Sequence, residues 1–546
     1  AADSDTRIHL QSDGNPTGAQ SGALSFRIWD RTTGSEGTTA NVNTDTNNQF
    51  TSTNSTVGIT INPVSAGNPI NSITLSALNG AATGATAGVK FNGVNGGGVT
   101  GDSAGSGVAG IGDVNGDGRA DLVIGASGLI GSAPDFTVGG GYVVYGDTTA
   151  NLRTLTNLTT GFSLAGTGSG VNSPGIQFNA PVFNARTGTS VSGFGDYNGD
   201  GITDILIGEN NISSGGIESG YVIFGDADPT DGGEFSELHN IGVDDLTGGD
   251  LNGDGLDDGG VIVGAADTTD PLVIRDAGDV DNDGISDFLV GQPSIDLSGS
   301  NEGQAFLVFG SASGFDGLNP LGGNNGTAVL NFDGATDNQN VGRSISGIGD
   351  INNDGFGDFA IGATASNFGK GGAYVVFGSS RGSLDTLPAL DSLNGANGGF
   401  ILDMSNSPFN PQFGFDVNRA GDFNADGFDD FIVGAPGTGE AYLVYGKSGG
   451  FTNLDVVNDL TGEGADTSFL ANGFMLGFQE QVGFSVTGAG DVNGDGYDDL
   501  LIGSTSASNA YILFGTGDVE PLLSVPQLLQ DLAPNVPQYR MVDFGP

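Results

Sequence analysis

The chain has 546 residues, of which 101 are glycine and none is cysteine, so disulfides and thiolate chemistry are excluded. Its 65 acidic residues against 14 lysines and arginines give a formal net charge of −51, which disfavours nucleic acid as a partner and predicts that the folded chain needs bound cations. No run approaches the roughly 18 apolar residues of a membrane span, and the first residues lack a signal-peptide pattern. We therefore expect no membrane insertion, and a secretion signal that has been removed or lies outside this sequence.

Residues 1–64 form the first predicted segment. Two alternating runs, ALSFRIWD from Ala23 and TVGITINPV from Thr56, flank a stretch rich in threonine, asparagine, serine and glycine. Such alternation predicts half-buried strands. The two runs resemble the closing strands of an Ig- or cadherin-like β-sandwich of the kind strung along large bacterial surface proteins. We expect residues 1–64 to form part of such a sandwich.

Residues 65–515 contain an internal repeat. A loop motif of the type GDVNGDGRADLVIG occurs seven times, with its first aspartate at Asp113, Asp196, Asp250, Asp279, Asp350, Asp422 and Asp491. Each loop leads into an aliphatic run, and six copies continue with a second run such as AYILFG from Ala510. Further runs complete several modules, among them SVTGAGD from Ser485 and the outer runs GFSLAG from Gly161, AVLNFDG from Ala328 and GFILDM from Gly399. Each run predicts a strand, and four strands per module are the composition of a β-propeller blade in an all-β protein.

The copy at Asp250 breaks the spacing of the repeat. The other loops follow one another at 69 to 83 residues, whereas only 29 residues separate Asp250 from Asp279. The run GGVIVG from Gly259 aligns with the outer run GFILDM of a later module. We interpret this copy as a loop of the same type, inserted before the outer strand of the second blade. Six blades are favoured, and seven with one reduced blade stay open.

The two ends of the repeat region predict how the ring closes. The last module stops after AYILFG and lacks an outer run, while residues 73–94 resemble the segment before the outer strand of other modules. Residues 73–94 are therefore expected to complete the last blade, which would remove an open sheet edge. Residues 516–546 combine five prolines with a leucine cluster, which favours a docking tail or a linker.

The repeated loop has the residue pattern of a calcium site. Position 1 is Asp, position 3 is Asn or Asp, position 5 is Asp, position 6 is Gly and position 9 is Asp, so alternate side chains of a tight turn converge, and the backbone carbonyl of position 7 adds a further oxygen. Hard cations prefer such oxygen cages. The predicted ligands, with position 7 contributing its carbonyl, are Asp113, Asn115, Asp117, Arg119, Asp121, Asp196, Asn198, Asp200, Ile202, Asp204, Asp250, Asn252, Asp254, Leu256, Asp258, Asp279, Asp281, Asp283, Ile285, Asp287, Asp350, Asn352, Asp354, Phe356, Asp358, Asp422, Asn424, Asp426, Phe428, Asp430, Asp491, Asn493, Asp495, Tyr497 and Asp499.

The residue that follows the loop decides which kind of calcium site this is. An EF-hand places a bidentate Glu at position 12, where this chain has aliphatic residues such as Ile124 and Ile502, followed by a strand and not a helix. The motif instead resembles the calcium loops of FG-GAP repeats, as in the integrin α-subunit propeller and its bacterial relatives, over about residues 73–515. The resemblance implies a β-propeller loaded with six or seven Ca²⁺ ions.

These features favour binding over catalysis. Only His9 and His239 could supply imidazole chemistry, and no triad, phosphate loop or zinc motif surrounds them. We expect that the protein is not an enzyme but a secreted, calcium-dependent adhesion or surface-assembly protein, such as a module of a bacterial surface layer, filament or adhesin. Its expected partner is a protein or a glycan at a cell surface. Self-assembly through the termini is a further expectation. A lectin-like glycan-binding propeller is the alternative, with Phe178 and Phe183 as candidate ligand-facing aromatics, and a hydrolase is a more distant one.

Overall fold

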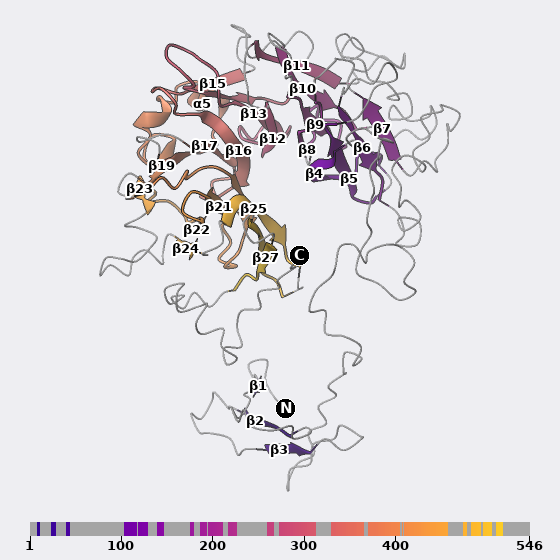
Figure 1. The fold of residues 1–546 in the computed structure, drawn as a ribbon, viewed down its shortest axis with the longest axis vertical. Helices are drawn as coiled ribbons and strands as arrows, with labels where there is room; N and C mark the ends of the chain where they lie inside the picture. Colours follow the sequence, from indigo (N-terminus) through magenta and orange to yellow (C-terminus); the bar gives the residue numbers. More distant parts are fainter. Residues whose placement is uncertain are drawn as a thin grey trace. The chain divides into compact units, whose positions relative to one another are not determined.

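The structure is a computed structural model of residues 1–546, and its elements are shown in Figure 1. The chain divides into two compact units, residues 1–71 with 522–540 and residues 72–521 with 541–546. No helix among the described residues combines the length and apolarity that a membrane crossing requires. The structure describes residues 8–10, 23–28, 40–43, 103–116, 118–128, 139–146, 175–179, 186–193, 195–210, 217–225, 259–266, 272–312, 329–364, 370–404, 407, 409–456, 473–477, 482–492, 495–504 and 509–516.

The first unit contains a three-stranded antiparallel sheet in its described part. Its strands are β1 (Ile8–Leu10), β2 (Ala23–Ile28) and β3 (Ala40–Asn43), in the order β1-β2-β3. Strand β2 falls in the alternating run from Ala23, as expected. The second expected run, from Thr56, lies outside the described residues, so the sandwich stays a prediction.

The second unit is a β-propeller, and its described part holds six sheets that follow one another along the chain. Neighbouring strands within a sheet are antiparallel, except for the short parallel β23 at the edge of the fourth sheet. Sheet by sheet, the strands are β4 (Ala104–Gly112), β5 (Asp121–Ala126), β6 (Gly140–Val144) and β7 (Gly175–Asn179); β8 (Ser190–Ser192), β9 (Ile205–Gly208), β10 (Ile217–Ile223) and β11 (Gly259–Ala266); β12 (Val273–Gly278), β13 (Asp287–Gln292), β14 (Gln304–Val308) and β15 (Val329–Asp333); β16 (Val341–Gly349), β17 (Asp358–Ala363), β18 (Gly372–Val376), β19 (Gly399–Asp403) and β23 (Leu454–Asp455); β20 (Val417–Gly421), β21 (Asp430–Ala435), β22 (Glu440–Val444) and β24 (Gly473–Gly477); and β25 (Val482–Gly490), β26 (Asp499–Ser504) and β27 (Asn509–Leu513). Two short helices, α5 (Arg381–Leu384) and η4 (Leu390–Ser392), lie between β18 and β19.

The core of the propeller lies between consecutive sheets. The first strands of successive sheets pack against one another, from β4 against β8 through to β20 against β25. In the third, fourth and fifth sheets the second and third strands are buried on both faces, as in β13 and β14, which explains why they are continuous aliphatic runs rather than alternating ones. Phe288 packs in a cluster with Leu206 of the preceding sheet, and Phe431 packs with Phe400 in the same way. Consecutive sheets in the described part of the propeller therefore bury their facing sides against one another.

The outer strands test the sequence-based assignments. Strand β11 pairs with β10, so the run after the Asp250 loop is the outer strand of the second sheet, as expected. In the first sheet β6 pairs with β7 at residues 175–179, whereas the run expected there, from Gly161, lies outside the described residues. Phe178 of β7 is only 3% exposed, so its assignment as a ligand-facing residue is wrong; Phe183 lies outside the described residues.

The closure of the propeller stays a prediction. In its described part the last sheet has the three strands β25, β26 and β27, consistent with the missing outer run. Residues 73–94, expected to supply that strand, and residues 517–546 of the tail lie outside the described part of the chain. The number of blades is likewise a prediction that the six described sheets support.

Candidate metal centres

Six described loops carry the repeated aspartate motif, and each connects the first strand of its sheet to the second. They begin at Asp113, Asp196, Asp279, Asp350, Asp422 and Asp491. Parts of the predicted ligand set lie outside the described residues, namely Asp117, Asn493 and the loop with Asp250, Asn252, Asp254, Leu256 and Asp258. Positions 1 to 9 of each loop are counted from its first aspartate.

The position 1 carboxylate organises the loop through backbone hydrogen bonds. In the fourth loop, Oδ1 of Asp350 accepts from the amide of Asp354 at 3.0 Å, and Oδ2 accepts from Gly355 at 2.8 Å. The position 5 carboxylate repeats the pattern, since Asp354 Oδ1 accepts from the amide of Phe356 at 3.1 Å. The loops that begin at Asp279, Asp422 and Asp491 have the same bonds. The side chains at positions 1 and 5 are thus turned into the loop.

The backbone of the loop requires two left-handed residues. Position 6 is always glycine, with φ of +92° at Gly355, a value that residues with a Cβ rarely adopt. Position 4 also has positive φ, +56° at Asn353 and +53° at Ala425. These two turns reverse the chain within a few residues, which brings positions 1, 3 and 5 to the same side.

The position 9 aspartate anchors the loop to the sheet behind it. Asp358 is fully buried, and its Oδ2 accepts from the amide of Ile351 at 3.0 Å while Oδ1 accepts from Gly378 at 2.8 Å, at the end of the third strand. The five other described loops have the same two bonds, at 2.6 to 3.0 Å. This carboxylate therefore has a structural role that the ligand pattern did not predict. Each oxygen keeps a second lone pair for a cation.

Burial makes the ionised form of the position 9 carboxylate unfavourable without a cation. Burial raises the pKa of Asp204, Asp287, Asp358 and Asp430 to about 8, although the two backbone amides lower it. Nearby carboxylates of the same loop raise the pKa further, namely Asp354 and Asp350 for Asp358, and Asp281 and Asp279 for Asp287. Burial also raises the pKa of Asp499. A divalent cation in the loop would offset both effects.

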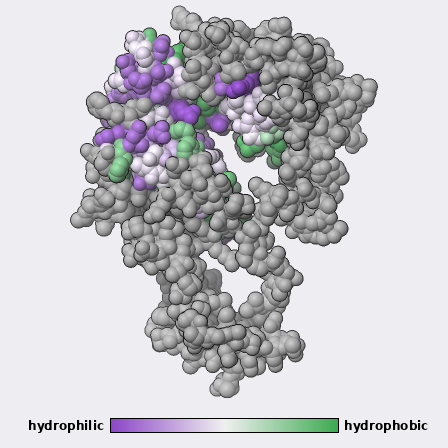
Figure 2. All heavy atoms as spheres, viewed as in Figure 1, coloured by the Kyte–Doolittle hydropathy of each residue, from purple (hydrophilic) through white to green (hydrophobic). Residues whose placement is uncertain are grey.

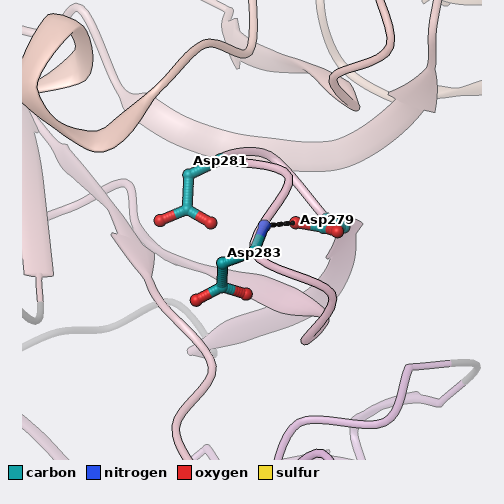
Figure 3. Close-up of side chains that lie close together, drawn as sticks. All are labelled: Asp279, Asp281 and Asp283. Carbon is teal, nitrogen blue, oxygen red and sulfur yellow. Dashed lines mark hydrogen bonds between the residues drawn. The ribbon is translucent and has the colours of Figure 1, made fainter.

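The third loop gathers three carboxylates around one point. Oxygens of Asp279, Asp281 and Asp283 lie within 4.8 Å of one another (Figure 3). Oδ1 of Asp281 is buried and accepts no hydrogen bond, and the same holds for Oδ1 of Asn352 at position 3 of the fourth loop. Buried oxygens without a partner are rare because they lose their hydration. The donor set and these two oxygens therefore fit a hard, oxygen-preferring cation such as Ca²⁺.

The third loop also has a neighbouring cation that sequence reasoning missed. It is the loop with Asp rather than Asn at position 3, and Nη1 of Arg381 lies 3.9 Å from Oδ2 of Asp281. The guanidinium stacks over the ring of Phe309 at 3.2 Å from its centroid. Burial and Asp283 raise the pKa of Asp281, and Arg381 lowers it. Arg381, the first residue of α5 in the next sheet, thus places a positive charge beside the extra carboxylate of this loop.

The described loops bring several of the predicted ligand positions together. The described side chains of positions 1, 3 and 5 belong to one turn, position 7 follows the position 6 glycine, and position 9 stands at the start of the second strand of the sheet. Coordination by these atoms, including the position 7 carbonyls, stays a prediction. The signal that could have identified the anchoring role of position 9 is its place at the start of a buried strand, as at the first residue of β17.

Known proteins share the repeat. The FG-GAP repeat family is matched over residues 419–449 and 482–518, which contain the last two described loops. Integrin alpha-V of Gallus gallus is 30% identical over 239 residues, 43% of this chain and 20% of the integrin. Integrin alpha-3 of Cricetulus griseus is 32% identical over 170 residues, 30% of this chain and 14% of the integrin. Integrin alpha pat-2 of Caenorhabditis elegans is 34% identical over 121 residues, 20% and 9% of the two chains. The matched region thus spans a fifth or less of each of these relatives.

Proposed function

We propose that this chain, an FG-GAP propeller of the integrin α type, is a secreted adhesion module that calcium holds in its folded form. The integrin relatives support a role in adhesion rather than catalysis. The observation that carries calcium dependence is the buried Oδ1 of Asp281. This oxygen has no hydrogen-bond partner, and two further carboxylates, those of Asp279 and Asp283, lie close to it. Calcium at that point would satisfy this oxygen and neutralise the charge around it.

Charge supports the same proposal at the level of the whole chain. Seven calcium ions would bring fourteen positive charges and reduce the formal net charge from −51 to −37. Binding to the folded state alone stabilises it by about 1.4 kcal/mol per site when free calcium is tenfold above the dissociation constant. Several such sites would account for a large part of the stability of an ordinary domain.

Thermal unfolding with calcium and with EGTA tests the proposal. We expect the midpoint to fall by many degrees in EGTA and to recover when calcium, but not sodium, is added back. Asp281→Ala should reduce the calcium-dependent part of the shift, whereas Asp337→Ala, an exposed carboxylate outside the loops, should leave it unchanged. An equal midpoint with and without EGTA would refute calcium dependence.

The partner is proposed to be a protein at a cell surface, with the chain acting as an adhesin or as a subunit of a bacterial surface layer or filament. The coloured part of the surface in Figure 2 is mostly hydrophilic, with hydrophobic colour in separate patches. Large exposed apolar side chains of the described residues are scattered, and Phe409 and Phe484 are the aromatic ones. Such a surface fits a reversible, charge-dependent partner better than an obligate apolar interface.

Binding of fluorescent beads coated with the protein to cells, in calcium and in EGTA, tests adhesion. Protease treatment of the cells should abolish binding if the partner is a protein. Loss of binding after glycosidase treatment, together with specific signals on a glycan array, would instead support the lectin-like alternative.

Measurement of the particle mass of the full chain in calcium tests self-assembly. A protein that is monomeric at high concentration would contradict self-assembly.

A further inference from the structure

Consecutive metal loops are joined by hydrogen bonds. In three pairs of loops, the backbone carbonyl of position 1 accepts from the amide of position 8 in the next described loop. Asp498 donates to Asp422 at 3.4 Å. Ser286 donates to Asp196 at 2.9 Å, and Gly357 donates to Asp279 at 2.9 Å. The loops of these pairs are therefore not independent turns, because each pair joins residues of two successive described sheets that are 76 to 90 residues apart.

In two pairs of loops, a carboxylate at position 8 contacts the backbone of the preceding loop. Oδ2 of Asp429 accepts from the backbone amide of Asp350 at 3.0 Å, and Oδ2 of Asp498 accepts from the amide of Asp422 at 2.9 Å. The other oxygen of Asp429 accepts from Nη2 of Arg419 at 2.7 Å. Each carboxylate thus holds the backbone of a predicted metal ligand from a neighbouring sheet, without being in the predicted ligand set itself.

The glycine before position 1 provides the space for this contact. At Gly349 an added Cβ would lie 2.1 Å from Oδ2 of Asp429, and at Gly421 it would lie 2.1 Å from Oδ2 of Asp498. Both glycines have positive φ, +80° and +76°. At Gly278, where position 8 of the next loop is Gly357 and has no side chain, an added Cβ would have no atom within 4 Å. Among the described loop pairs, a carboxylate at position 8 therefore approaches the glycine before position 1 in these two pairs.

We propose that Asp429 and Asp498 are positioning residues that set the calcium affinity of the loop in the preceding sheet. Asp429 acts on the loop at residues 350–358, and Asp498 acts on the loop at residues 422–430. The inference rests on the proposed calcium binding of these loops. Its physical basis is that a fixed amide at position 1 orients the carboxylate of the same residue, which must bind both the loop backbone and the cation.

Partners that orient metal ligands usually change metal affinity by about 10- to 100-fold when they are removed. We expect a shift of about tenfold or more for Asp429→Ala at residues 350–358. The Asn variants keep an oxygen that can accept from the same amide, so they should restore much of the affinity if orientation is the cause. If only the negative charge mattered, Asn and Ala would weaken binding equally.

Hydrogen–deuterium exchange with mass spectrometry reads each loop separately in the full chain. Peptides that contain residues 279–287, 350–358 and 422–430 are followed against the concentration of calcium chloride. Asp429→Ala should raise the calcium midpoint for 350–358 and leave 279–287 within about twofold, which also shows that the variant is folded. Asp498→Ala should raise the midpoint for 422–430 and leave 350–358 unchanged. Asp337→Ala is the matched control, because it removes an exposed carboxylate that accepts one backbone amide, from Ser300 at 3.2 Å.

The outcomes separate this inference from the proposed function. If calcium protects the loops of the wild-type protein but neither Ala variant shifts the preceding loop, the positioning role is wrong and calcium binding stands. If calcium protects none of the loops in the wild-type protein, both are wrong. Equal shifts in all loops would also contradict the inference, because they would show a global loss of stability. Shifts confined to the preceding loop, reduced in the Asn variants, would confirm it.

Discussion

Calcium binding should release protons from the buried position 9 carboxylates. Burial raises the pKa of Asp204, Asp287, Asp358 and Asp430 from 3.8 to about 8 in the calcium-free protein. These groups therefore hold a proton at pH 6 when calcium is absent. Because a cation requires the ionised carboxylate, binding must displace that proton.

The magnitude follows from the distance between pH and pKa. At pH 6 a group with a pKa of about 8 is almost fully protonated, so we expect close to one proton released per occupied loop. At pH 9 the same group is about 10% protonated and the release should fall to roughly a tenth. Without calcium, the folded state holds protons that the unfolded state loses above pH 4. The free energy of unfolding should then fall between about pH 4 and pH 8 by up to about 1.4 kcal/mol per pH unit for each group.

Isothermal titration calorimetry in buffers of different ionisation enthalpy measures the proton release directly. The observed binding enthalpy should depend on the buffer at pH 6 and become almost independent of it at pH 9. Chemical unfolding in EGTA at a series of pH values gives the stability without calcium, which should decrease towards pH 8. Calcium binding at pH 6 without proton release would refute the reasoning, because the position 9 carboxylates would then be ionised before calcium arrives.

Three substitutions test local features of the loops by chemical unfolding. Tyr197→Phe should lower stability by about 1–2 kcal/mol, because Tyr197 donates to Oδ1 of Asp276 at 2.9 Å, and an unchanged midpoint would show that this bond contributes nothing net. Ala425→Asn should raise stability by about 0.5 kcal/mol, since φ is +53° and Asn tolerates that conformation better; a lower midpoint would contradict this. Gly427→Ala should lower stability by about 1–2 kcal/mol, because φ is +92° while a Cβ would have open space, and a neutral result would show that the turn relaxes without strain.

The fold could be predicted from the sequence to the extent that its signals are local and repeated. Aliphatic runs beside the aspartate loops identified the buried second and third strands, and the alignment of the run at Gly259 identified β11 as an outer strand. The outer strand of the first sheet was not found, because β7 has the sequence GIQFN, with little aliphatic character, and is separated from β6 by a long connection. The position of β7 is set by its pairing with β6, and a local sequence pattern carries no information about that pairing.

At the candidate sites, too, the sequence predicted the local features of each loop but not its contacts with neighbouring sheets. The motif predicted which side chains share a loop, and in the third loop the carboxylates of Asp279, Asp281 and Asp283 do lie close together, while their coordination of a metal stays a prediction. It did not reveal Arg381 beside Asp281, nor the link from Asp429 to Asp350, since these pairs are 100 and 79 residues apart in the chain. Such contacts depend on how neighbouring sheets pack. The adjacent pairs Asp429-Asp430 and Asp498-Asp499 were the sequence signal that could have suggested a second role for position 8.

Loop and sheet depend on each other through position 9. Asp430 is the first residue of β21, and it is fully buried. Its two oxygens hold the amide of Phe423 in the loop and that of Gly446 after the third strand, which ties three segments of one sheet to a single carboxylate. Ionising this group in a buried place is costly, and a cation in the loop removes that cost. A metal bound at the surface turn would therefore stabilise the strands behind it, which is a direct physical route from calcium to the stability of the propeller.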